Sequence, residues 1–205
     1  MISFKDMRKI DVIFAVLAGG GISLLISGLL RSYGLELKPF LNWFLLIVFP
    51  ILAIIGLWIA ELIGKRFLFI YQIAKFLLIG ILATLVDLGV LNFLIWISPI
   101  YLGWYFNIFK GISFLVATFA KFWGNKFWAF EKTEKTGMGK EITQFYLVTL
   151  VGLVINVGIA SFLVNTIGPK FGMPTTIWLN FGAIVAAIIV AVWNFLGYKF
   201  IVFKK

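Results

Sequence analysis

Three ionisable side chains lie inside long apolar stretches of this 205-residue chain: Asp87, Lys110 and Lys121. A charge at such a depth costs about 2–3 kcal/mol or more unless it is paired or hydrated, so each is a candidate functional residue. With a helical rise of about 1.5 Å per residue, Asp87 and Lys110 lie at similar depths, about 20 and 24 Å from one face. They are therefore predicted to meet across a hairpin, either as a structural ion pair or as part of a site.

Lys121 lies only about 7 Å from the same face. The one acidic residue expected at its depth is Glu61. Lys121 either extends its ammonium group to the headgroups or contacts a ligand. Lys110 and Lys121 are 11 residues apart, which returns a helix to within about 20° of one direction. Three further polar residues lie within about 80° of it, namely Asn107, Thr118 and Asn125. This polar stripe is predicted to face protein or a wet cavity, since lipid would make it costly.

The C-terminal two-thirds of the chain consists of two similar copies of one sequence pattern. Residues 76–95 align without a gap on residues 145–164, and after a longer loop Lys126 aligns on Lys199. The alignment indicates a tandem duplication of about residues 72–130 and 141–203. Such proteins commonly place their site where the repeats meet. Each copy contains two apolar stretches, so both copies have the same orientation.

The two copies differ in their charges. Asn156 aligns on Asp87, Ala183 on Lys110 and Asn194 on Lys121. The first copy thus presents charged side chains where the second presents amides and an alanine. This asymmetry suits an elongated amphiphile with an anionic end better than a symmetric pore. The residues predicted to bind substrate are polar residues of both copies: Asp87, Asn107, Lys110, Lys121, Asn125, Lys126, Asn156, Asn180 and Asn194.

Composition places these residues in a membrane protein. Hydrophobic residues make up 62% of the chain and charged residues 13%, against about 25% charged in soluble domains. The fold class is therefore an all-α integral membrane protein with six transmembrane helices. The spans are expected at about residues 12–30, 40–63, 74–97, 105–126, 144–165 and 177–198. Residues 1–71 form a two-helix extension, and residues 72–205 form a four-helix domain.

Local features of the first two spans refine this picture. The Gly19-Gly20-Gly21 run predicts a close helix contact, and Pro50 predicts a kink. The first span has a basic flank but no small-residue cleavage site, which favours a retained anchor.

Basic residues predict the orientation. Thirteen lie on the side that holds both termini, and three lie on the other, namely Arg31, Lys38 and Lys170. The positive-inside rule then places both termini in the cytoplasm, with the chain in the cell membrane. Much of the net charge of +10 lies on one face, where it serves topology or attracts anionic lipids or an acidic partner.

Enzymatic chemistry has no support in the residues. The chain has no cysteine or histidine, and no paired carboxylates, metal-ligand cluster or glycine-rich phosphate loop. No catalytic residue, metal or cofactor is predicted. No nucleic-acid partner is predicted, because the basic residues only flank apolar spans.

Several motifs in order resemble the GtrA-like family of small membrane proteins. These are Phe76 to Gly80 followed by Asp87, then Asn125 to Phe130, and in the second copy Tyr198 to Phe203. The resemblance covers about residues 72–205. Residues 1–65 are an addition that the family does not explain, and Tyr198 departs from Asn125 of the first motif.

The resemblance implies a part in cell-surface polysaccharide or glycoconjugate synthesis. Its expected activity is flipping of a polyprenyl-phosphate-linked sugar, beside a membrane glycosyltransferase. The residues are compatible with that substrate or with another anionic lipid. A basic entrance suits the phosphate, a polar stripe suits the sugar, and aromatic side chains suit the isoprenoid tail. The alternatives are a membrane anchor for such a glycosyltransferase and, third, a small cation exporter, whose cationic substrate two lysines would repel. A homo-oligomer is left open.

Overall fold

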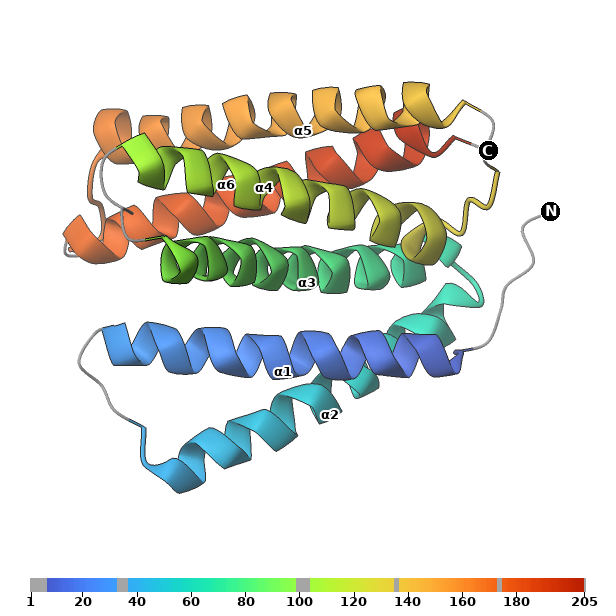
Figure 1. The fold of residues 1–205 in the computed structure, drawn as a ribbon, viewed down its shortest axis with the longest axis horizontal. Coiled ribbons are helices and arrows are strands. Elements are labelled where there is room, and N and C mark those ends of the chain that lie inside the picture. Colours follow the sequence, from blue (N-terminus) through green and yellow to red (C-terminus); the bar gives the residue numbers. More distant parts are fainter. Residues whose placement is uncertain (1–6, 33–36, 99–103, 135–136, 173–174, 205) are drawn as a thin grey trace. The chain divides into compact units, whose positions relative to one another are not determined.

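The computed structural model describes residues 7–32, 37–98, 104–134, 137–172 and 175–204. Every regular element in these ranges is helical, which confirms the predicted all-helical class. The α-helices of Figure 1 are α1 (Lys9–Ser32), α2 (Pro39–Gly64), α3 (Leu68–Ile97), α4 (Trp104–Gly124), α5 (Met138–Ser161) and α6 (Thr175–Gly197). Short π-helical turns follow three of them: η1 (Asn125–Ala129), η2 (Phe162–Ile167) and η3 (Tyr198–Val202).

Among the residues that the structure describes, five helical segments are long and apolar enough to cross a membrane. They are Lys9–Gly28, Pro39–Gly64, Leu68–Ile97, Met138–Ile159 and Val185–Val202. α4 is not among the five. The continuously described side chains of α4 run only from Gly111 to Gly124, a stretch shorter than a membrane span. The chain is a multi-pass membrane protein in which a bilayer enforces helices, because only internal hydrogen bonds can satisfy the backbone there.

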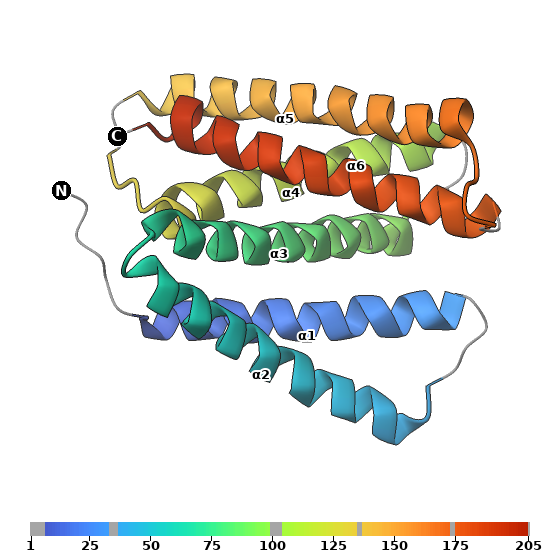
Figure 2. The ribbon, with the colours of Figure 1, turned by 180° about the vertical axis from the view of Figure 1, so that it is seen from behind.

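The chain divides into two compact units, residues 1–131 and residues 132–205. In the first unit α1 pairs with α2 and α3 pairs with α4, while α3 also contacts α1 and α2. Figures 1 and 2 show α1 and α3 running side by side. The basic end of this unit is the end at which α1 and α3 begin and α2 and α4 terminate. The second unit contains α5, η2, α6 and η3, with α5 against α6.

The α1–α2 pair is held at a close backbone contact. A Cβ atom on Gly19 would lie 2.5 Å from the Cα of Pro50, so only glycine fits there. A Cβ on Gly20, one residue along, would meet no atom within 4 Å. Gly19 therefore makes the helix contact that the glycine run predicted. From this crossing, α2 diverges from α1 toward the end opposite the basic end (Figures 1 and 2).

Corresponding contacts close the two hairpins. In the first unit, a Cβ on Gly124 would lie 3.2 Å from Ile79, and Phe130 N donates to Asn125 O at 2.9 Å. In the second, a Cβ on Gly197 would lie 2.5 Å from Val148, and Phe203 N donates to Tyr198 O at 2.8 Å. These pairs occupy the positions that the sequence alignment of the two copies makes equivalent. The division predicted at residues 71 and 72 remains a prediction.

Candidate functional site

The polar stripe of α4 approaches the basic end through Thr118, Lys121 and Asn125. Thr118 and Asn125 are buried, and Lys121 is half-buried. Asn125 Nδ2 donates to the carbonyl oxygen of Lys121 at 2.8 Å, which anchors the amide one helical turn below the lysine. Lys121 Nζ lies 5.9 Å from the centroid of the buried Phe76 ring on α3. The described part of the stripe thus presents a cation beside an aromatic face, with access to solvent.

Two oxygens of predicted site residues are buried without a hydrogen-bond partner among the described residues. They are Oδ1 of Asn125 in the first unit and Oδ1 of Asn194 in the second. Unpaired buried acceptors are costly, at about 1–3 kcal/mol each. In each unit this amide oxygen can therefore accept a hydrogen bond from a water molecule or from a ligand hydroxyl.

Not all the basic residues counted on the cytoplasmic side face solvent. Lys126 is fully buried in η1, with Nζ 5.8 Å from the centroid of the Phe127 ring. Lys132 is also buried, because it pairs with Glu141 at 2.8 Å and donates to Lys204 O at 2.9 Å. These two lysines are therefore enclosed by protein, whereas Lys140 is exposed.

Asp87 on α3 has a neutral partner on α4. Ser113 Oγ donates to Asp87 Oδ1 at 2.6 Å, and the serine is fully buried. Ser113 lies three residues after Lys110 and so on the same side of α4. The side chains of Asn107, Lys110 and Asn180 lie outside the described residues, and the Asp87–Lys110 pair stays a prediction. The expected partner at the depth of Lys121, Glu61, is buried and accepts from Met7 N at 3.2 Å.

The second unit has different side chains at the positions that the sequence alignment makes equivalent to this stripe. Asn194, which aligns on Lys121, is buried, with its Oδ1 2.7 Å from the position that a Cβ on Gly152 would take. Tyr198, which aligns on Asn125, stacks on Phe145 at 4.2 Å between ring centroids and shares a 2.7 Å hydrogen bond with Thr149. Asn156 is half-buried. The second unit is uncharged at each of these positions.

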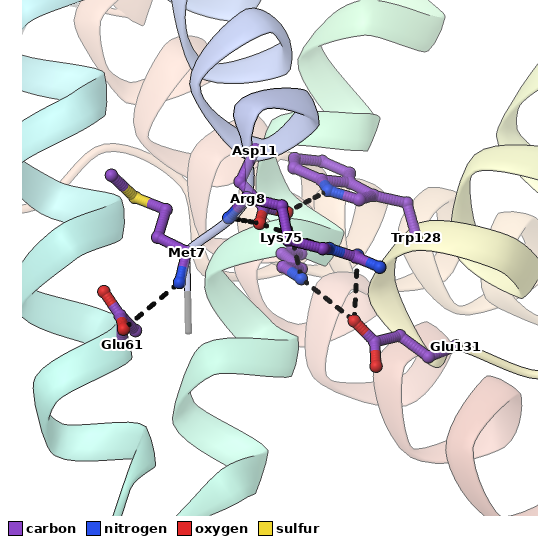
Figure 3. A network of polar contacts seen from close by, with 7 residues as sticks. All are labelled: Met7, Arg8, Asp11, Glu61, Lys75, Trp128 and Glu131. Carbon is purple, nitrogen blue, oxygen red and sulfur yellow. Dashed lines mark hydrogen bonds and ion pairs between the residues drawn. The ribbon is translucent and has the colours of Figure 1, made fainter. Parts of the chain in front are cut away.

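An ionic cluster that the sequence analysis missed lies at the basic end of the first unit (Figure 3). It consists of Arg8, Asp11, Lys75 and Glu131. Lys75 Nζ lies 3.1 Å from Asp11 and 3.4 Å from Glu131, and Arg8 lies 2.9 Å from Glu131. Asp11 also accepts from Trp128 Nε1 and, at 2.6 Å, from Arg8 N. Lys75 and Asp11 are almost fully buried.

The cluster joins the N-terminal extension to the helices after it. Arg8 directly precedes α1 and Asp11 lies in its first turn, whereas Lys75 belongs to α3 and Trp128 to η1. Lys75 Nζ also lies 4.2 Å from the Tyr71 ring centroid, so an aromatic face replaces part of its lost hydration. Acidic residues at the ends of apolar spans, such as Asp11 and Glu131, were the signal available in the sequence. Which basic residue each one meets depends on helix packing.

This arrangement can bind and position charged groups. Within the described ranges, no group of three or more acidic side chains could hold a metal ion. Lys121 can attract an anion while Thr118, Ser113 and the Asn125 amide offer hydrogen bonds along the same helix. Electrostatic attraction of an anionic headgroup, followed by polar contacts at greater depth, is the chemistry that these residues support.

Comparison with known proteins agrees with this chemistry. The model of the GtrA/DPMS transmembrane domain matches residues 75–203, more than half of the chain. No curated protein and no solved structure matches this chain. Members of the family are generally non-catalytic, and the match supports a membrane function related to polyprenyl-phosphate-linked sugars and their glycosyltransferases. The predicted resemblance is confirmed, and the chain belongs to the GtrA/DPMS family of membrane proteins.

Proposed function

We propose that this protein moves a polyprenyl-phosphate-linked sugar from one leaflet of the cell membrane to the other. The observation that carries the proposal is the series of polar side chains along the α3–α4 hairpin. Lys121 stands half-buried near the basic end, and the hydrogen-bonded Ser113–Asp87 pair lies deeper in the same hairpin. Polar groups at that depth are costly for a purely structural hairpin, which supports a role in conducting a polar headgroup.

The substrate has three chemical parts, and the site offers a counterpart for each. Lys121 supplies a positive charge for the phosphate, in reach of water. Hydroxyl and amide groups of the stripe supply hydrogen bonds for the sugar, including the unpaired Asn125 Oδ1. Exposed aromatic and aliphatic side chains, such as Phe119 and Leu115 on α4, supply an apolar surface for the isoprenoid. Asp87, deeper in the same hairpin, completes the proposed path.

The proposal includes a topology. We propose α4 as a sixth span, because it packs against α3 and its described uncharged polar residues, Ser113 and Thr118, are buried. The last four spans then form two tandem hairpins of the same orientation, and both termini lie in the cytoplasm. The matched closures at Gly124 and Gly197 support this duplication.

The main alternative is a membrane anchor for a polyprenyl-phosphate glycosyltransferase. The basic inner loops would then be its contact surface, and the helices would carry no substrate. The part-buried Ser113–Asp87 hydrogen bond favours translocation, since docking a glycosyltransferase at the inner loops requires no carboxylate deep in a hairpin. A small cation exporter, the third candidate, is disfavoured because lysines outnumber aspartates in the spans.

Translocation is measured with purified protein in proteoliposomes that contain a short-chain polyprenyl-phosphate sugar. Transfer is followed as the fraction of sugar that a membrane-impermeant oxidant or lectin can reach. We expect transfer faster than in protein-free vesicles. Transfer no faster than in those vesicles, together with co-purification of a membrane glycosyltransferase, would identify an anchor instead.

A further inference from the structure

A cavity lies between α1 and α2 at the end of the first unit opposite the ionic cluster. Its volume is about 480 Å³, and it is open to the surface. It exists because the two helices touch at Gly19 and Pro50 and diverge beyond that contact (Figures 1 and 2). Leu24, Ser27, Gly28 and Arg31 line it from α1, and Asn42 and Leu46 from α2. The family match begins after both helices, at residue 75.

The cavity combines a cation, two hydrogen-bonding groups and an apolar wall. Ser27 Oγ donates to Asn42 Oδ1 at 3.0 Å, which orients the asparagine and leaves its Nδ2 hydrogens available to an acceptor. Arg31 lies four residues after Ser27 and so on the same side of α1. No carboxylate lines the cavity in the part of the chain that the structure describes. Leu24, Leu37 and Leu46 give the cavity its apolar wall.

We propose that this cavity binds the phosphate headgroup of an anionic lipid. Arg31 would pair with the phosphate through its planar guanidinium, and the Asn42 amide would donate a further hydrogen bond. The acyl chain would lie against Leu24 and Leu46. Because the cavity is at the end of two apolar helices, it stands at the depth of lipid headgroups, and Leu24 is largely exposed. The volume suits a headgroup and the first part of a chain, rather than a whole lipid.

The proposal is independent of translocation, since it concerns only α1 and α2. It would give the extension a role, namely to hold an anionic lipid in the leaflet opposite the basic end. The competing explanation is that Arg31, in the last turn of α1, only offsets the helix dipole. That explanation predicts no dependence of lipid binding on the cavity.

The first test is lipid binding by the full chain in detergent. Phosphatidylglycerol is added stepwise, and native mass spectrometry counts the bound lipid. Loss of a charged hydrogen bond of about 1.5–3 kcal/mol predicts that Arg31→Gln weakens binding about tenfold or more, and that Arg31→Lys retains part of it. Lys170→Gln is the matched control, since Lys170 is an exposed basic residue of the second unit. Unchanged binding by Arg31→Gln, or an equal loss with Lys170→Gln, overturns the proposal.

The second test fills the cavity without removing its charge. A Cβ on Gly28 would meet no atom within 4 Å, so Gly28→Leu should fold and place a side chain where the acyl chain would lie. Gly56→Leu is its control, because Gly56 is also exposed and free of neighbours within 4 Å. We expect lipid binding to fall in Gly28→Leu alone. Retained binding there overturns the lipid as occupant, as does inorganic phosphate binding as tightly as phosphatidylglycerol. Thermal unfolding checks that each variant is folded.

Discussion

Lys121 combines a position on the polar stripe of α4 with partial exposure at the basic end. If it contacts the phosphate of the transported lipid, Lys121→Gln should slow leaflet transfer about tenfold or more, as expected for the loss of about 1.5–3 kcal/mol from a charged contact. Lys121→Arg should retain part of the rate, because charge matters more than shape for a mobile headgroup. The measurement is transfer in proteoliposomes, with thermal stability recorded for each variant.

The matched control for Lys121 is Lys140→Gln, which removes an exposed lysine on the basic side of the second unit. It should leave transfer nearly unchanged. A well-folded Lys121→Gln protein that transfers at the wild-type rate would assign Lys121 to snorkelling toward the headgroups.

Asp87 is the second residue whose role can be separated from stability. If Asp87 and Lys110 form a structural pair, Asp87→Asn should lower the melting temperature, and adding Lys110→Met should restore much of it. If the two belong to the site, the double variant should be folded but inactive in transfer. Ser113→Ala supplies the comparison, since it removes the hydrogen bond to Asp87 without changing any charge. Additive destabilisation without rescue would show that Asp87 and Lys110 do not interact.

At the scale of elements, the ionic cluster fixes α1 to α3 and η1. Lys75→Met leaves the buried Asp11 carboxylate without its lysine partner, and breaking a buried pair in this way typically costs about 3–5 kcal/mol. Asp11→Asn combined with Lys75→Met should recover much of that loss, because no unpaired charge remains. Glu131→Gln should cost less, since that side chain is 28% exposed. Thermal unfolding in detergent provides the comparison, and equal losses for the single and double variants would contradict the model of a coupled pair.

The α1–α2 contact offers a second test at this scale. Gly19→Ala places a methyl group against the backbone of Pro50, so the helices must separate and the melting temperature should fall. Gly20→Ala, its neighbour, meets no atom and should be neutral or stabilising by up to about 1 kcal/mol from helix propensity. A similar effect of the two substitutions would argue against the observed crossing.

For the whole molecule, the distribution of basic residues predicts the topology. Glu134 and Phe171 are exposed residues on either side of α5, and the chain has no native cysteine that would react. A cysteine at Glu134 should be protected from a membrane-impermeant thiol reagent added outside, whereas one at Phe171 should react. The reverse pattern would place the basic side outside the cell and overturn the assigned orientation.

Much about this protein is determined by sequence alone. Apolar runs of about 20 residues must form helices in a bilayer, since lipid cannot satisfy the backbone. Hydropathy therefore predicted a helical membrane protein, and the ordered motifs around Asp87 and Asn125 predicted the family that residues 75–203 match. The Gly19 contact was also readable, because small residues in membrane helices mark close approaches.

Tertiary structure decided which polar groups meet. The pairing of Asp87 with Lys110 rests on depth and stays a prediction. The hydrogen bond from Ser113 to the same carboxylate could not be read from depth, which leaves the rotation of each helix free. Asp11 and Trp128 are 117 residues apart, and no period in the sequence relates them. The cavity beside Arg31 depends on the angle at which α2 leaves α1. The hydrophobic pattern sets the length and depth of a membrane helix, whereas side-chain packing sets its rotation and tilt. Rotation and tilt then determine which polar side chains contact each other.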